Sequence, residues 1–103
     1  MYKMINVYFA PKDPEHFKKY YREVHVPLGV HPLIKRRFHT FDVGTIKDAG
    51  APIPSDVFCY WEAEFESKET FLQCCREMQH VADDTYNYAT GGFFLMHFEV
   101  PDK

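Results

Sequence analysis

The amino-acid sequence predicts an α+β fold whose elements follow the order β-α-β-β-α-β, as in ferredoxin-like sandwiches. Four stretches rich in aromatic and β-branched residues predict strands, because each is bounded by turn-forming residues. Two of the intervening stretches carry apolar residues every three or four positions, which is typical of helices. A chain of 103 residues has room for one core, so a single domain is expected over residues 1–103. We therefore expect one four-stranded antiparallel sheet with two helices on one face.

The first strand is predicted over residues 2–10, which are mostly aromatic and β-branched and precede a proline. A helix is predicted to follow at about 14–25. Asp13 is its expected N-cap, because its carboxylate can accept hydrogen bonds from the free N–H groups of the first turn. Pro14 occupies the first helical position, where its missing N–H costs nothing. Pro27 is expected to end the helix, since proline disfavours helical geometry in the residue before it.

After a turn-rich connector, the second strand is predicted over 34–46 and the third over 57–65. The segment between them is rich in Gly, Pro and Asp and is expected to be a loop. Ser67 is the expected N-cap of the second helix. Residues 81–88 either continue that helix or form a separate short turn. A turn at two glycines precedes the fourth strand, which is predicted over 93–100.

Both faces of the predicted sheet are rich in apolar residues, although the helices can cover only one of them. The residues that leave few positions for water are Met4, Tyr8, Phe41, Phe58, Tyr60, Phe94, Met96 and Phe98. With 46% apolar and 17% aromatic residues, the chain has more apolar surface than so small a core needs. We therefore predict that a second copy covers the open face and forms a two-fold homodimer.

The composition argues against several classes of partner. A net charge of −3 and a pI of about 6.0 provide no basic surface for nucleic acid. No stretch approaches the roughly 20 apolar residues of a membrane span, so no membrane partner is expected. The chain has three cysteines, which are Cys59, Cys74 and Cys75. Because their number is odd and they lack metal-ligand spacing, they indicate neither a disulfide framework nor a zinc site. Cys75 is expected in the core and Cys74 at its edge. These features predict a reduced, cytoplasmic protein.

The segment Phe17–Leu28 carries the pattern F-x-x-Y-Y-x-x-x-H-x-P-L. Together with the order of elements over about residues 2–100, this pattern resembles the EthD family of the dimeric α+β barrel superfamily. The resemblance implies a ferredoxin-like subunit that pairs through its sheet. It extends to cofactor-free enzymes such as methylmuconolactone isomerases, and more distantly to polyketide cyclases and small quinone-forming monooxygenases. Those relatives use a histidine, sometimes with a tyrosine, for proton transfer in an apolar pocket, and that histidine corresponds to His25.

One feature of the methylmuconolactone isomerases is missing from this chain. Their third strand carries a cysteine that would fall near Ala63 or Glu64 here, and neither position is a cysteine. Cys59 lies earlier on the predicted strand. The departure argues against that particular isomerisation, and a shared fold does not fix the reaction.

His25 is the expected catalytic residue, and two opposing effects act on it. The C-terminal end of a helix favours its charged form, whereas partial burial favours its neutral form. Together they can hold its pKa near neutrality, where a general acid or base works best. Tyr21, four residues earlier on the same side, is its expected catalytic partner. The alternative is that His25 caps the last helical carbonyls and that Tyr21 is a core aromatic.

Further residues are expected to contact a ligand around one pocket. They are Tyr20, His31, His39, Tyr60, Trp61 and His97. Each of them has an alternative structural explanation, either in packing against the sheet or in a local hydrogen bond. No two histidines or acidic residues have a known metal spacing, so we expect no metal. The resemblance to cofactor-free enzymes implies that no cofactor is bound. The acidic pair Asp83-Asp84, near the end of the second helix, is expected on a solvated face.

Three hypotheses about function remain open at this point. The first is a small cofactor-independent protein that binds an apolar, oxygenated, cyclic molecule, with His25 transferring a proton during isomerisation, dehydration, ring closure or oxygenation. The second is a non-catalytic dimer that binds such a molecule or supports a degradation or oxygenase pathway. The third is a stress- or pathway-associated dimer with no small ligand. An apolar cavity beside His25 would favour the first two hypotheses over the third.

Overall fold

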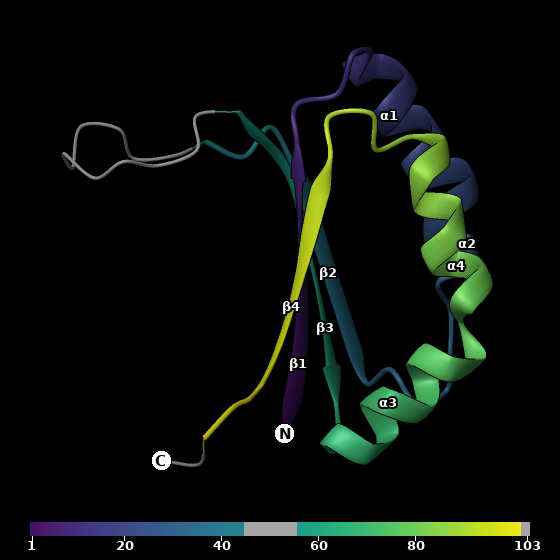
Figure 1. Cartoon of the computed structure of the whole chain (residues 1–103), viewed down its shortest axis with the longest axis vertical. Coiled ribbons are helices and arrows are strands. Elements are labelled where there is room, and N and C mark those ends of the chain that lie inside the picture. Colours follow the sequence, from purple (N-terminus) through teal and green to yellow (C-terminus); the bar gives the residue numbers. More distant parts are fainter. Residues whose placement is uncertain (45–55, 102–103) are drawn as a thin grey trace, which may run out of the picture.

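The computed structural model describes residues 1–44 and 56–101 and places a layer of helices against one face of a four-stranded antiparallel sheet (Figure 1). The strands are β1 (Tyr2–Phe9), β2 (Arg36–Phe41), β3 (Val57–Phe65) and β4 (Phe93–Glu99). Their order across the sheet is β2-β3-β1-β4, so β1 and β3 are central. The predicted α+β ferredoxin-like fold is confirmed. No helix in the described part of the chain is both long enough and apolar enough to cross a membrane.

The central strand β1 separates the two faces of the sheet by simple alternation. Tyr2, Asn6 and Tyr8 are buried under the helices and Met4 lies on the same side, whereas Lys3, Ile5 and Val7 point to the opposite face. In the antiparallel register, Asn6 lies opposite Trp61 of β3 and Leu95 of β4, so these side chains share the helix-facing side. The register therefore makes Asn6, Trp61 and Leu95 neighbours on the side of the sheet that the helices cover.

Two aromatic clusters join the sheet to the helices. The larger cluster is buried around Tyr8, Phe17, Tyr21 and Tyr88, and the Tyr8 and Tyr88 hydroxyls are 2.8 Å apart. The second cluster contains Tyr2, Ala63, Phe65, Phe71 and Cys74. Such edge-to-face and offset ring contacts stabilise a core beyond the area that they bury. The helices are thus fixed at both ends of the sheet, and the space between the clusters is available for a cavity.

The first helix continues past Pro27, so the prediction that Pro27 ends it is wrong. Its parts are α1 (Pro14–Tyr20), the π-helical turn η1 (Tyr21–His25) and α2 (Val26–Leu28). Val26 keeps helical angles, with φ −59° and ψ −44°, and its N–H donates to the Tyr21 carbonyl five residues earlier. The wider π turn changes which carbonyl each N–H faces, and this shift accommodates the proline ring. The predicted N-cap is confirmed, since the Asp13 carboxylate accepts from the His16 N–H at 3.1 Å.

The second helical region is divided into α3 (Lys68–Glu77), α4 (Gln79–Asp84) and the 3₁₀ turn η3 (Thr85–Asn87). Ser67 caps α3 as predicted and forms a reciprocal capping box with Thr70. The chain bends at Met78, whose φ is −117°, so the later segment is separate from α3. Cys74 is buried and Cys75 is exposed, the reverse of the prediction, because Cys74 lies one turn after the buried Phe71 on the sheet-facing side of α3.

The second strand is shorter than the predicted 34–46. It ends at Phe41, and Asp42 has a φ of 56°, which is incompatible with an extended strand. Residues 45–55, which contain the end of the predicted strand and most of the predicted loop, lie outside the described residues. The third and fourth strands match their predicted positions closely.

The face of the sheet opposite the helices carries exposed apolar side chains. Phe38, Phe94, Met96 and Phe98 are 49%, 41%, 45% and 39% exposed. Figure 1 shows all the labelled helices on the other side of the sheet. Four other apolar residues were also expected to help exclude water from this face, but they belong to the helix-facing side. They are Met4, Tyr8, Phe41 and Phe58. The apolar open face is therefore smaller than the sequence predicted, although it is still present.

Candidate functional site

A cavity of about 210 Å³ lies between the helix-facing side of the sheet and the helices. Its walls are mostly apolar side chains, including Met4, Trp61, Phe65, Met78, Val81 and Leu95. His25 and Asn6 are among the few polar residues that line it. Concave, mostly apolar sites with a few placed polar groups are typical of small-molecule binding.

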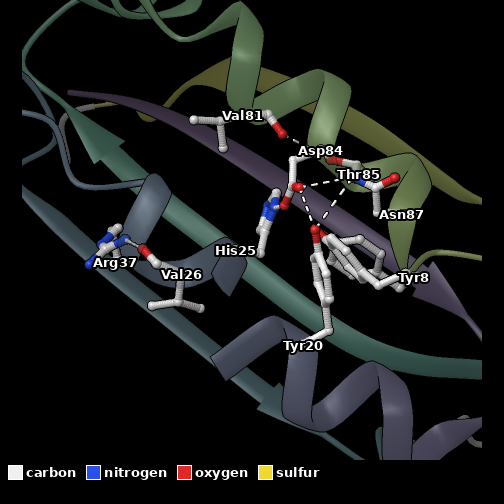
Figure 2. A network of polar contacts seen from close by, with 10 residues as sticks. Tyr8, Tyr20, His25, Val26, Arg37, Val81, Asp84, Thr85 and Asn87 are labelled. Carbon is white, nitrogen blue, oxygen red and sulfur yellow. Dashed lines mark hydrogen bonds and ion pairs between the residues drawn. The ribbon is translucent and has the colours of Figure 1, made fainter. Parts of the chain in front are cut away.

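The His25 ring is held by a carboxylate from the second helical region. Its Nδ1 lies 2.9 Å from Asp84 Oδ2, and the two side chains are only 12% and 11% exposed. Asp84 Oδ1 accepts from the Tyr20 hydroxyl at 2.7 Å and from Asn87 Nδ2 at 3.0 Å. Figure 2 shows Asp84 between His25 and Tyr20, with Asn87 beside it. Both carboxylate oxygens are therefore paired, and the network joins two separate helical regions.

Local structure explains how these side chains meet. Tyr20 ends α1 and His25 ends the π turn that follows, so both lie at one end of the first helical region. Asp84 is the last residue of α4, and Asn87 ends the next 3₁₀ turn. The expectation that Asp84 lies on a solvated face is wrong. A signal was present in the sequence, because Val81 and Tyr88, three residues before and four after Asp84, place it on an apolar side of the helix.

The hydrogen bond to Asp84 determines how a neutral His25 ring is protonated. A carboxylate accepts but does not donate, so Nδ1 carries the proton and donates it to Asp84. Nε2 is then the nitrogen with a free lone pair. No hydrogen bond to Nε2 occurs among the described residues, and His25 lines the cavity. In this tautomer, Nε2 is the ring nitrogen that can accept a proton.

Burial and pairing act in opposite directions on both members of the pair. Burial lowers the pKa of His25 below 6.5, and the hydrogen bond and negative charge of Asp84 offset this only in part. Burial alone would raise the pKa of Asp84, but hydrogen bonds from Tyr20, His25 and Asn87 together lower it. Near neutral pH, the stable state is therefore a neutral imidazole beside an ionised carboxylate.

Two aromatic rings pack on the imidazole of His25. The Tyr21 ring is stacked on it at a centroid distance of 5.4 Å, and the Tyr88 ring lies 4.7 Å away. Tyr21 is fully buried, does not line the cavity, and burial raises its pKa. Its hydroxyl has no hydrogen-bond partner among the described residues. This placement allows Tyr21 to orient His25, while its hydroxyl does not face the cavity.

The structure places the other predicted ligand contacts in three settings. Trp61 lines the cavity, and Tyr20 reaches the site through Asp84. The other four do not line the cavity. His31 pairs with Glu77, and His39 packs on Tyr21 and Phe41. His97 hydrogen-bonds Tyr2, and Tyr60 donates to Glu62 on the open face. Among the described residues, no three His, Cys, Asp or Glu side chains are placed to hold a metal ion.

Asn6 is a cavity residue that was not singled out from the sequence. It is only 5% exposed, and its side-chain oxygen has no hydrogen-bond partner among the described residues. From sequence alone it is one polar residue in an aromatic strand, and its importance depends on which face the helices cover. Asn6 adds a buried amide to the cavity wall, and Asp84 holds the His25 ring from outside the lining; neither belonged to the predicted set of site residues.

Comparisons with known proteins agree with this architecture. No family model matches the chain. An uncharacterized 11.0 kDa protein from the thcB-thcC intergenic region of Rhodococcus erythropolis is 32% identical over 100 residues, covering 93% of this chain and 91% of that protein. An EthD family protein from Bacillus halodurans has a similar solved structure, with a TM-score of 0.83, 25% identity, and coverage of 98% of this chain and 99% of that one.

A dimeric ferredoxin-like protein of unknown function from Thermobifida fusca shares the fold at 10% identity and a TM-score of 0.65, covering 97% of this chain and 92% of its own. That likeness concerns the fold alone. The identity and near-complete coverage of the first two relatives carry more weight, and the TM-score of the EthD family protein agrees with the order of elements in the structure. The chain belongs to the EthD family.

Proposed function

We propose that the protein binds a small, mostly apolar cyclic ketone in the cavity, and that His25 removes a proton from the carbon next to the carbonyl. The observation that supports this proposal is the 2.9 Å contact between His25 Nδ1 and Asp84 at the wall of an apolar cavity. The contact leaves Nε2 as the base. A neutral ring compound suits the apolar walls, because a charged ligand would lose its hydration there.

The proton transfer is balanced by the groups at the site. The electron pair of the C–H bond forms the new C=C bond, and the π pair of the carbonyl moves onto its oxygen to give an enolate. The proton moves to His25 Nε2. The resulting imidazolium is stabilised by the ionised Asp84, as in other histidine–carboxylate pairs. Return of the proton to the same or to another atom of the enolate completes an exchange or an isomerisation. No external oxidant or reductant is required for this step.

The low pKa of His25 is consistent with a role as a base. A ring that is already neutral near pH 7 needs no deprotonation before it accepts a proton. Tyr20 and Asn87 keep Asp84 ionised and oriented through their own hydrogen bonds. Asp84, Tyr20 and Asn87 are thus positioning residues, and His25 is the proposed catalytic residue.

Deuterium exchange into a model ketone tests the proposal. α-Tetralone is incubated in heavy water with wild type, His25→Gln or His31→Gln, and loss of the proton signal next to the carbonyl is followed by NMR. His25→Gln is expected to slow exchange on the order of 100-fold, the usual contribution of a general base. His31→Gln is the control, because His31 pairs with Glu77 outside the cavity.

Two outcomes would contradict the catalytic proposal. Equal exchange by wild type and His25→Gln would remove His25 from the mechanism. Binding of the ketone with exchange no faster than in buffer would favour the alternative of a ligand-binding protein without catalysis. That alternative is consistent with the same cavity, and it predicts that His25→Gln changes affinity alone.

A further inference from the structure

Asn6 occupies the middle of β1, on the side of the sheet that faces the helices. Its side chain is 95% buried and lines the same cavity as His25. The register places it directly opposite Trp61 on one side and Leu95 on the other, and both also line the cavity. An amide in this position is therefore surrounded by apolar walls on two sides.

The Asn6 amide has no partner within the described protein. Its oxygen is buried without a hydrogen bond, and no side-chain hydrogen bond among the described residues involves its nitrogen. Buried polar groups are nearly always paired, so an unpaired amide that lines a cavity points to a partner inside that cavity. Within the cavity, a water molecule or a ligand oxygen can accept a hydrogen bond from the amide N–H, and the ligand oxygen can displace the water.

We propose that the Asn6 amide binds the carbonyl oxygen of the ligand and so selects ketones over hydrocarbons of the same shape. The inference deepens the proposed function and rests on it, since both place a cyclic ketone in this cavity. The amide oxygen is the buried, unpaired atom, and the amide nitrogen carries the N–H groups that can donate to the ligand. The remaining walls, with Trp61 and Leu95 beside the amide, contact the apolar ring.

The same hydrogen bond also assists the proton transfer. Negative charge develops on the carbonyl oxygen as His25 takes the proton, and a hydrogen-bond donor that is already in place stabilises that charge. Asn6 belongs to the central strand of the sheet, which is paired on both sides. The donor is therefore fixed by the backbone before the ligand arrives.

A matched pair of ligands tests the inference independently of catalysis. α-Tetralone and tetralin differ by one carbonyl, and the affinity of each is measured by NMR from the shift of the indole signal of Trp61, the single tryptophan. Wild type is expected to bind the ketone roughly two- to tenfold more tightly, which corresponds to one hydrogen bond. Asn6→Leu, close in shape and apolar, is expected to bind both compounds equally.

Three further variants complete the experiment. Met4→Leu, which changes a cavity residue two positions earlier on the same face, is expected to keep the preference for the ketone. His25→Gln is also expected to keep it, because the preference belongs to Asn6. Asn6→Val is measured beside Asn6→Leu, so that the inference does not depend on the folding of one variant.

The outcomes separate this inference from the proposed function. A ketone preference that persists in Asn6→Leu and Asn6→Val overturns the role of Asn6, as does equal binding or no binding of the two compounds by wild type. A preference lost in both variants supports it, even if His25→Gln leaves deuterium exchange unchanged and the catalytic proposal fails.

Discussion

The Asp84 carboxylate determines which nitrogen of His25 is available to a ligand. Asp84→Asn removes the negative charge that partly offsets the effect of burial on His25. The pKa of His25 is therefore expected to fall further, because the charged ring loses its partner. Nδ1 also loses its obligatory acceptor, since an amide can present either an oxygen or an N–H. We expect exchange into α-tetralone at a rate between those of wild type and His25→Gln.

The measurement is an NMR titration of the His25 ring together with the exchange assay. Asp83→Asn is the control, because the neighbouring carboxylate contacts Gln79 instead of His25. The role assigned to Asp84 is wrong if Asp84→Asn and Asp83→Asn give the same titration curve and the same rate.

The direction of the His25 pKa also predicts how stability changes with pH. Its pKa is below 6.5 in the folded chain, so the unfolded chain binds more protons between the folded value and 6.5. The contribution of His25 to the free energy of unfolding is therefore complete above pH 6.5 and decreases as the pH falls toward the folded pKa.

The rate of catalysed exchange should likewise fall below the folded pKa of His25 and stay level above it, because the neutral His25 ring is the base.

Urea unfolding at a series of pH values tests the stability part. The wild type is compared with His25→Gln, in which this contribution is absent. A wild-type curve parallel to that of His25→Gln across this interval would show that the pKa of His25 is not lowered by folding.

Tyr21 provides a test of the catalytic tyrosine that the sequence suggested. Its hydroxyl is buried and unpaired among the described residues, and it does not line the cavity. Tyr21→Phe removes the hydroxyl and keeps the ring that stacks on His25. We expect wild-type exchange and a free energy of unfolding within about 1 kcal/mol of wild type or higher, since no hydrogen bond is lost. A large loss of exchange would restore Tyr21 to the mechanism.

At the residue scale, the sequence predicts His25 more readily than its partners. His25 belongs to a compact pattern along one helix, so its place follows from local spacing. Asp83 and Asp84 are adjacent on a helix and point in different directions, and the packing of α4 decides which of them is buried. Asn6 has no local signal at all, because its meaning depends on which side of β1 the helices cover. Tertiary packing supplies the missing information in both cases.

At the scale of elements, local sequence patterns predict that a helix or strand forms more reliably than they predict where it begins and ends. The caps at Asp13 and Ser67 were predictable because each acts through hydrogen bonds within one turn. Pro27 shows where such rules stop, since Val26 was expected to leave helical geometry and did not. The π turn before it places His25 near Asp84, and packing on Tyr88 stabilises that arrangement. The continuation of the helix past Pro27 depends on contacts between distant parts of the chain. The spacing of residues within one helix does not predict it.

The turn before β4 gives a prediction about backbone packing. A Cβ at Gly91 would lie 2.8 Å from the Phe9 carbonyl oxygen and closer still to the Ala10 carbonyl oxygen. One at Gly44 would meet no described residue within 4 Å. Gly91→Ala is expected to lower the free energy of unfolding by roughly 1–3 kcal/mol, because strand backbone must move. Gly44→Ala is the matched control and is expected to be near neutral. Thermal unfolding of both variants measures the difference, and equal midpoints would refute it.

At the scale of the whole molecule, the uncovered side of the sheet bears on assembly. Phe94, Met96 and Phe98 of β4 and Phe38 of β2 are exposed there, and such patches commonly mark interfaces. We propose that a second copy covers this face. Light scattering is then expected to give twice the chain mass of 12.2 kDa. Met96→Glu should yield the monomer, while Leu72→Glu, on exposed α3 surface, should not.

The strand β1 contributes to both sides of the sheet at once. Asn6 faces the cavity, and its neighbours Ile5 and Val7 face the opposite side, where the second copy is proposed to bind. If that pairing occurs, its contacts hold the same backbone that positions the amide. Ligand affinity then depends on how much of the protein is paired, and dilution weakens both together. Protein concentration is therefore the quantity to hold fixed whenever ligand binding to this chain is measured.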